Sequence, residues 1–268
     1  MSGTLSGKRV LVIGASAGIG RALAVRAVQE GAQVLMAARR GAELEKAAAE
    51  ARGGQPVTVD VRVPEDCARL ATAARETLGQ IDILAFTVGA ATLSMMADTD
   101  AEDLRRAFET NVIGFHQPMR SCLPLLAPNA VVMVLSSESI DQPFSALGAY
   151  VTSKQALERT LMAWRTEHPG IRFCRVRVGQ TFPTEFGSAF DGAVLTRAMA
   201  DWAARGLAKA QFMTPEEVAG ALVGILRTAA DHPGICLDEL MVRSSSAATE
   251  SFDRALEDAA GQPGLPDS

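Results

Sequence analysis

The chain has 268 residues, a formal net charge of −5 at pH 7 and 48% hydrophobic residues. This content is ample for a buried core, and the negative charge gives no electrostatic reason to expect a nucleic-acid partner. No secretory signal or apolar run of about 18 residues is visible, so we expect no membrane partner and a cytoplasmic location. The four cysteines lack Cys-x-x-Cys spacing and are expected to be reduced core residues: Cys67, Cys122, Cys174 and Cys236.

Strand and helix signals alternate along the chain up to about residue 243. Short apolar runs indicate buried strands, and Ala-, Leu- and Glu-rich segments between them indicate helices. The strands are expected at residues 9–13, 33–37, 55–60, 81–86, 131–135, 171–178 and 239–242. The alternation predicts an α/β, doubly wound (Rossmann-type) three-layer sandwich with a seven-stranded parallel sheet, formed by a single domain over residues 1–243.

A glycine-rich turn follows the first strand. Its sequence, Gly14-Ala15-Ser16-Ala17-Gly18-Ile19-Gly20, opens a helical pattern that stops at Gly31. Glycines let the backbone turn tightly and let a pyrophosphate approach the helix N-terminus, where unpaired N–H groups and the helix dipole favour an anion. A glycine turn without a ligand is the alternative, but a strand before it and a helix after it favour dinucleotide binding. We expect cofactor contacts from Gly14, Ser16, Gly18, Ile19 and Gly20.

The end of the second strand bears on the choice of cofactor. An acidic residue there would accept hydrogen bonds from the ribose hydroxyls of NAD and repel a 2′-phosphate, but this chain has Ala38. Arg39 follows immediately, and its guanidinium can hold the 2′-phosphate through two parallel hydrogen bonds or stack on adenine. Arg40 is expected to contact the cofactor as well. The alternative is that both arginines are solvated loop charges. The pattern favours NADP over NAD.

Asn111 lies inside a helical stretch expected to run from about residue 100 to residue 126. An amide in a helix interior is mildly unfavourable, so it either faces water or has a role such as holding a chain of water molecules. A purely structural use is the alternative.

Ser137 ends the apolar strand Val131-Val132-Met133-Val134-Leu135-Ser136. Ligands of open α/β sheets bind at the carboxyl ends of the strands. Ser137 is therefore placed to hydrogen-bond a substrate oxygen.

Tyr150, the only tyrosine of the chain, precedes Lys154 by four residues. If the segment is helical, both side chains share one face, where the ammonium can stabilise a phenolate and lower the phenol pKa from about 10. Such a phenol is a general acid/base for alcohol and carbonyl chemistry. A lysine at this spacing is also common on the solvated face of an amphipathic helix, so the pair alone is weak evidence.

The connection from about residue 180 to residue 212, before a helix that begins near Pro215, is rich in aromatic residues. These are Phe182, Phe186, Phe190, Trp202 and Phe212. In a substrate lid they would form an apolar pocket. The spacing of the first three fits a core-facing helix stripe equally well.

Two helix ends and the C-terminal tail complete the pattern. His168-Pro169-Gly170 and His232-Pro233-Gly234 read as helix stops, and His116 is isolated, so no metal site is proposed. The tail, residues 244–268, is expected to be frayed, with one short helix near residues 251–259.

In combination, the glycine turn, Asn111, Ser137 and Tyr150 with Lys154 resemble the short-chain dehydrogenase/reductase family, over nearly the whole chain. The resemblance implies hydride transfer between a nicotinamide and a carbonyl carbon, with Tyr150 as general acid/base. It also implies that Ser137 orients the substrate oxygen, that Lys154 binds the nicotinamide ribose and lowers the Tyr150 pKa, and that Asn111 holds a water that relays protons.

Further cofactor contacts are implied by the same resemblance. Asp60-Val61 is similar to the adenine-contacting pair of the family, and Tyr150 and Lys154 count as cofactor contacts too. Phe86-Thr87-Val88-Gly89 departs from the usual Asn-Asn-Ala-Gly and retains only Gly89, although Thr87 could supply a hydrogen bond. Val178-Gly179 stands where the family has Pro-Gly and retains only the glycine. Gly179 and Thr181, two residues later, are expected to contact the cofactor.

Other functions stay open at this point. The chain could bind a dinucleotide as a non-catalytic sensor or scaffold, since fold does not dictate function. Sugar-nucleotide epimerisation or dehydration is a further possibility, but no longer substrate domain is evident after Gly179. The expected partners are a small carbonyl or alcohol substrate and, by the resemblance, copies of the chain in a homodimer or homotetramer.

Overall fold

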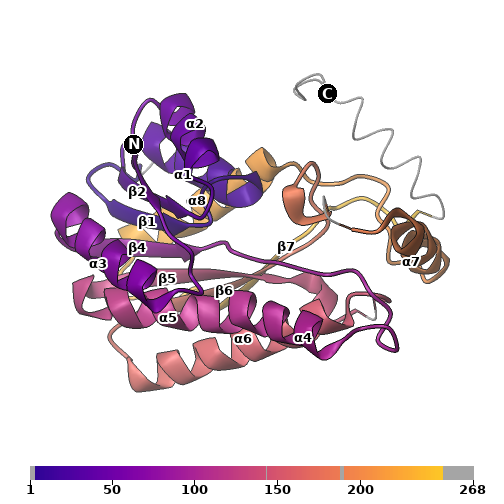
Figure 1. The fold of residues 1–268 in the computed structure, drawn as a ribbon. Helices are drawn as coiled ribbons and strands as arrows, with labels where there is room; N and C mark the ends of the chain where they lie inside the picture. Colours follow the sequence, from indigo (N-terminus) through magenta and orange to yellow (C-terminus); the bar gives the residue numbers. More distant parts are fainter. Residues whose placement is uncertain (1–3, 143, 188–189, 250–268) are drawn as a thin grey trace.

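The computed structural model describes residues 4–142, 144–187 and 190–249. Its centre is a seven-stranded sheet in the order β3-β2-β1-β4-β5-β6-β7, in which every neighbouring pair is parallel (Figure 1). The strands are β1 Arg9–Ile13, β2 Gln33–Ala38, β3 Gln55–Thr58, β4 Ile81–Phe86, β5 Leu126–Ser137, β6 Arg172–Val178 and β7 Glu239–Val242. The doubly wound fold expected from the sequence is confirmed.

Helices connect the strands. They are α1 Gly18–Gln29, α2 Gly41–Ala51, α3 Pro64–Leu78, α4 Ala101–Phe108, α5 Gly114–Cys122, α6 Gly148–Glu167, α7 Gly192–Ala204 and α8 Pro215–Asp231. A π-helical segment, η1 Glu109–Ile113, joins α4 to α5, and short 3-10 turns occur at η2 Leu123–Leu125, η3 Glu138–Ile140 and η4 Glu185–Gly187.

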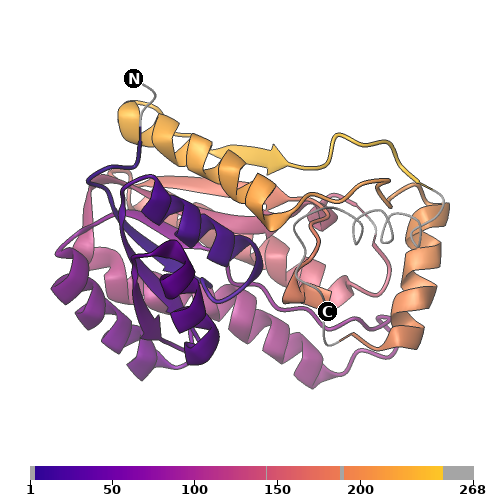
Figure 2. The ribbon, with the colours of Figure 1, turned by 90° about the horizontal axis from the view of Figure 1, so that it is seen from above.

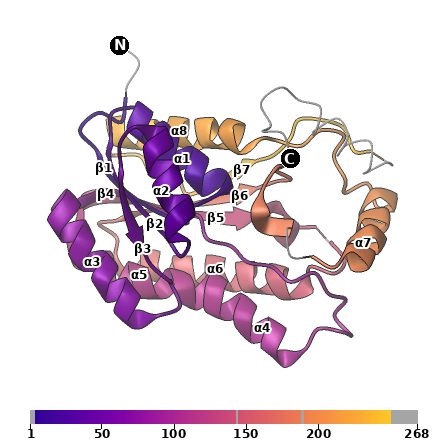
Figure 3. The ribbon, with the colours of Figure 1, turned by 45° about the horizontal axis from the view of Figure 1, so that its top comes forward.

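The sheet is covered on both faces, because alternate residues of each buried strand point to opposite sides. Val10 and Val12 of β1 pack with α1, α2 and α8, whereas Leu11 and Ile13 pack with α3, α5 and α6. Figures 1 and 3 show these two groups of helices on opposite sides of the sheet. The core is therefore divided between the two faces.

Three expected boundaries were wrong. The strand expected over residues 131–135 runs from Leu126 to Ser137, because Leu126 already pairs with Ile81 of β4. The third strand ends at Thr58 rather than at residue 60, because its ladder with β2 ends at the pair Ala38 and Thr58, and the Asp60 N–H turns to the Asp66 carboxylate at 2.9 Å. The helix expected over residues 100–126 begins as predicted, with Asp100 capping Asp103 N–H at 2.7 Å. It is then interrupted by η1, and its predicted end at Leu126 is the first residue of β5.

The other helix ends follow their local signals. Thr214 and Glu217 form a capping box at the start of α8, with Pro215 in the first turn. His168 and His232 are the C-caps of α6 and α8, as their His-Pro-Gly sequences predict.

All four cysteines are free, but Cys236 is exposed, so its assignment to the core was wrong.

The segment from Gln180 to Phe212, which contains η4 and α7, extends beyond the carboxyl ends of the strands. Figure 2 shows the yellow arrow of β7 pointing toward it. Its two ends are joined, since Phe182 N–H donates to Met213 O at 2.9 Å and Met213 N–H to Gln180 O at 3.1 Å. The three phenylalanines do not share one helix, because η4 spans only Glu185–Gly187 and α7 begins at Gly192.

The described part of the tail pairs with the end of this segment. Ala210 N–H donates to Ala247 O at 3.0 Å, and Thr249 N–H to Ala208 O at 2.9 Å. The short helix expected near residues 251–259 lies outside the described residues.

Across the part of the chain that the structure describes, no helix is both long and apolar enough to cross a membrane. The same residues include no group of three or more His, Cys, Asp or Glu placed to hold a metal ion.

Candidate active site

Tyr150 and Lys154 lie one turn apart on α6 and face the carboxyl ends of the strands. Both are buried, at 7% and 3% exposed. The Lys154 ammonium donates to Leu135 O at 3.0 Å and to Val88 O at 3.3 Å, and it lies 5.8 Å from the centroid of the Tyr150 ring. The solvated-face alternative is therefore excluded for this pair.

The titration of this pair differs from the expectation. Burial raises the pKa of Tyr150 to about 12, and a hydrogen bond with Ser137 acts in the opposite direction. Burial also lowers the pKa of Lys154 to about 8, which the Glu158 carboxylate opposes. The expected lowering of the phenol pKa by Lys154 was wrong for this structure, because burial dominates the pKa of Tyr150 and raises it.

Ser137 lies beside Tyr150. It is the last residue of β5 and the N-cap of η3, where its Oγ accepts from Ser139 N–H at 3.2 Å and lies 2.8 Å from Ser139 Oγ. Its influence on the Tyr150 pKa places the two hydroxyls near each other at the end of β5. Such a pair can bind one carbonyl or hydroxyl oxygen from two directions.

Asn111 is fully buried in the π-helical segment η1. Its amide donates to Ala90 O at 2.9 Å and to Ser153 Oγ at 2.8 Å, and its oxygen accepts from Ala90 N–H at 2.8 Å. Ser153 in turn donates to Tyr150 O at 2.7 Å. Asn111 thus ties the loop after β4 to the first turn of α6, which gives it a structural use, and one lone pair of its oxygen remains for a further donor.

The glycine turn is braced by Thr87. Its hydroxyl donates to Ile13 O at 2.9 Å, which supplies the hydrogen bond that the sequence allowed. A Cβ on Gly14 would lie 2.4 Å from Thr87 Oγ1, and one on Gly20 would lie 2.2 Å from Gly14 O, so neither position admits a side chain without a shift. Helix α1 begins here, and its N-cap, Ala17, supplies no side-chain hydrogen bond. The N–H groups of its first turn are therefore suited to an anion.

Arg40, rather than Arg39, contacts this turn. Its guanidinium donates to Ser16 Oγ at 3.2 Å and forms an ion pair with Glu185 of η4. Arg39 is exposed, and its charge makes a small contribution to the lowered pKa of Asp60, for which the hydrogen bond from Arg62 is the largest cause. Ser16 and Arg40 together can hold a phosphate next to the glycine turn.

The other expected cofactor positions lie around the same edge of the sheet. Val61 is buried, and Gly114 must lack a side chain because a Cβ there would lie 2.8 Å from Val61 Cγ2. A Cβ on Gly89 would lie 3.2 Å from Lys154 Nζ. Gly179 N–H donates to Val242 O at 2.8 Å, and Thr181 Oγ1 donates to Gly179 O at 3.0 Å.

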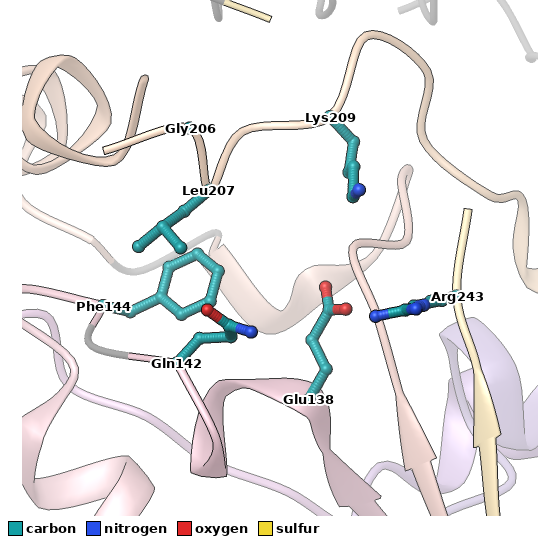
Figure 4. A pocket seen from close by; sticks show the side chains of 7 residues that line it. All are labelled: Glu138, Gln142, Phe144, Gly206, Leu207, Lys209 and Arg243. Carbon is teal, nitrogen blue, oxygen red and sulfur yellow. The ribbon is translucent and has the colours of Figure 1, made fainter. Parts of the chain in front are cut away.

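Two residues near the site were missed by sequence reasoning, Glu138 and Gln180. Glu138 directly follows Ser137 and lines a cavity of about 80 Å³ opposite Lys209 and Arg243 (Figure 4). Burial raises the pKa of Glu138, while the hydrogen bond from Gln180 N–H, at 3.1 Å, and the two cations act against it. The Gln180 amide donates to Leu207 O at 2.7 Å and accepts from Lys209 N–H at 3.1 Å. Glu138 and Gln180 therefore fasten both ends of segment 180–212 to the sheet.

A buried ion cluster supports α6 below the site. The Glu158 carboxylate accepts from Arg175 at 2.8 Å and from Arg177 at 2.9 and 2.8 Å. Burial works against ionisation, but the hydrogen bond from Arg177 holds the pKa of Glu158 below its usual value and raises that of Arg177.

Aromatic side chains cover Tyr150 on the side of segment 180–212. The Phe186 ring meets Tyr150 edge to face, with centroids 4.9 Å apart, and Phe190 packs on Phe186 at 5.6 Å. Trp202 of α7 donates its indole N–H to Ser145 O at 3.0 Å and packs on Phe144 at 5.4 Å. These contacts leave the Tyr150 phenol in an apolar environment.

Comparison with known proteins adds to this geometry. Residues 8–194 match the family described as short chain dehydrogenase. Among curated proteins, glycine betaine reductase ATRR of Emericella nidulans is 33% identical over 90% of this chain and 19% of its own length. The 11-beta-hydroxysteroid dehydrogenase A of Sesamum indicum is 32% identical over 61% of this chain and 49% of its own length.

The chain thus spans about a fifth and about a half of the lengths of these two relatives. Among solved structures, the alcohol dehydrogenase of the archaeon Thermococcus sibiricus, complexed with 5-hydroxy-NADP, superposes with a TM-score of 0.76. That match has 22% sequence identity and covers 89% of this chain and 97% of the other. At this identity, the likeness speaks for the fold.

Proposed function

The chain belongs to the short-chain dehydrogenase family, and we propose that it is an NADP-dependent oxidoreductase that interconverts a carbonyl compound and a secondary alcohol. The observation that carries the proposal is the buried Tyr150 phenol, which lies beside Ser137 and near the Lys154 ammonium. This pair of hydroxyls at the end of β5 is suited to an oxygen that gains or loses a proton.

The residues around the glycine turn fit a 2′-phosphorylated dinucleotide. The first turn of α1 offers N–H groups to a pyrophosphate, and Arg40 with Ser16 offers donors to a 2′-phosphate. Ala38, in place of an acid, leaves that position uncharged. When bound, the nicotinamide would supply or accept the hydride.

In the reducing direction, Tyr150 donates its proton to the substrate oxygen. A pKa of about 12 keeps the phenol protonated at neutral pH, so the donor form is the resting form. Ser137 donates a second hydrogen bond that orients and polarises the same oxygen. Lys154 binds the nicotinamide ribose, and its hydrogen bonds to Leu135 O and Val88 O hold the ammonium near the Tyr150 ring.

Asn111 completes the proposed proton path. Its oxygen has one lone pair left after Ala90, and a water held there would return a proton to Tyr150. The cofactor ratio would set the physiological direction.

The substrate is proposed to be a moderately apolar carbonyl compound. Phe186, Trp202 and Leu93 surround the phenol, and segment 180–212 would act as the substrate lid. We propose further that the chain forms a homodimer or homotetramer, in which the exposed Ile113 and Met162 would lie at a contact between copies.

The decisive test is a screen of ketones and secondary alcohols with NADPH and with NADH, followed at the absorbance of the reduced nicotinamide. Turnover with NADPH and a carbonyl compound is the expected result. Tight NADPH binding without turnover of any compound would instead favour a sensor or scaffold.

A further inference from the structure

Three consecutive residues of segment 180–212 touch three parts of the proposed cofactor site. Thr184 Cβ and Cγ2 both lie 3.7 Å from where a Cβ on Gly18 would be, so this side chain covers the glycine turn. Glu185 forms an ion pair with Arg40. Phe186 packs edge to face on Tyr150, with ring centroids 4.9 Å apart. Residues 184–186 therefore bridge the site from the glycine turn to the catalytic phenol.

The Glu185 carboxylate and the proposed 2′-phosphate would compete for the Arg40 guanidinium. A guanidinium offers a planar fork of donors that fits a carboxylate or a phosphate, and the Arg40 guanidinium also donates to Ser16 at 3.2 Å. Glu185 therefore contacts the same guanidinium that the proposed 2′-phosphate would need. The side chains of Arg40 and Glu185 are 41% and 52% exposed, so this ion pair is weak and a doubly charged phosphate can displace the carboxylate.

We propose that Glu185 is a specificity-determining residue that competes with the 2′-phosphate for Arg40. When the phosphate takes Arg40, residues 184–186 are released, which uncovers Gly18 for the pyrophosphate and Tyr150 for the substrate. The inference rests on the proposed use of NADP. It adds that the 2′-phosphate, far from the reacting carbon, controls access to that carbon.

A cofactor fragment tests this without catalysis. We choose 2′-AMP, which carries the 2′-phosphate but has no nicotinamide to push on Phe186, and 5′-AMP as its isomer of equal charge. The measurement is hydrogen–deuterium exchange at residues 184–187 together with the dissociation constant of each nucleotide. In the wild-type protein, 2′-AMP should speed exchange in this segment, and 5′-AMP should not.

The variant Glu185→Gln removes the competing charge while it preserves the size of the side chain. Without any nucleotide, its segment 184–187 should exchange about threefold to fivefold faster than that of wild type, and its affinity for 2′-AMP should rise by the same factor, the range expected for an exposed ion pair. Glu45→Gln is the matched control, because Glu45 is an exposed glutamate of α2. It should leave the affinity within about twofold, since distant exposed charges are screened.

Two results would overturn the inference, and only the second would also overturn the proposed NADP dependence. If Arg40→Ala weakens 2′-AMP binding but Glu185→Gln changes neither affinity nor exchange, the phosphate site stands and the competition is wrong. If wild-type protein binds 2′-AMP no better than 5′-AMP and Arg40→Ala has no effect, the proposed NADP dependence fails together with the inference.

Discussion

The ammonium of Lys154 donates a hydrogen bond to the carbonyl of Leu135 at 3.0 Å, which ties α6 to the strand that ends in Ser137. Because Leu135 and Ser137 lie on the same strand, this bond helps to fix the serine hydroxyl relative to the Tyr150 phenol on α6. The lysine therefore positions the site in addition to its proposed contact with the cofactor.

Tyr150→Phe is expected to abolish most of the turnover while the affinity for NADPH is retained. The ring still packs against Phe186, but the proton donor is gone. A general acid contributes about 10² to 10⁴-fold, so kcat for any substrate found in the screen should fall by that factor. A kcat within a few-fold of wild type would show that another group supplies the proton.

The burial of Lys154 should appear in the pH dependence of stability. Its pKa falls from 10.5 to about 8 on folding, so between these pH values the unfolded chain binds more protons and stability from this group rises with pH. Wild type should therefore gain up to about 3 kcal/mol relative to Lys154→Met across this interval. Urea unfolding of both proteins in reductant at pH 7, 8, 9 and 10 measures the difference, and parallel curves would contradict it.

Arg40 is expected to dominate the preference for NADPH. Ala38→Asp with Arg40→Ala installs an acceptor for ribose hydroxyls and removes the proposed phosphate partner. A charge-assisted hydrogen bond is worth roughly 1.5 to 3 kcal/mol, so NADPH affinity should fall about tenfold to hundredfold, and NADH affinity should rise. Arg39→Ala is the matched control, because Arg39 is exposed and adjoins Arg40 in the chain. Equal losses from both arginine changes would assign the phosphate to both side chains.

Glu158→Gln should destabilise the protein, because it leaves Arg175 and Arg177 without their shared buried carboxylate. Breaking a buried ion pair on one side costs about 3 to 5 kcal/mol. Glu239→Gln removes the exposed carboxylate that faces the same arginines, and it should cost less than about 1 kcal/mol. Urea unfolding at pH 7 measures the loss of unfolding free energy for each variant. Equal losses would show that the burial of Glu158 does not determine how much its ion pairs contribute to stability.

Much of the fold could be predicted from the sequence, because parallel strands buried on both faces are continuous apolar runs between glycine and proline stops. The ends of β1, β4 and β7 coincide with the expected ones for this reason. Ser137, at a strand end, and Tyr150 with Lys154, on one helix face, follow from local spacing alone.

The remainder depends on contacts between distant segments. The pKa of Tyr150 could not be predicted, since it follows from how deeply the packed fold buries the phenol. The bonds from Glu138 to Gln180 and from Gln180 to Leu207 and Lys209 join positions far apart in the chain, and no local pattern marks them. The choice of Arg40 over Arg39 likewise depends on where the helix α2 begins.

The Gln180 amide fixes residues 207 and 209 to the start of the same segment, so residues between these anchors can vary without disturbing the sheet. The part of segment 180–212 between these anchors can therefore be exchanged as a unit. A designer who wished to change the proposed substrate could replace residues 190–206 and keep residues 184–186, which contact the proposed cofactor site. Evolution would have the same freedom, provided that Glu138 and Gln180 are kept.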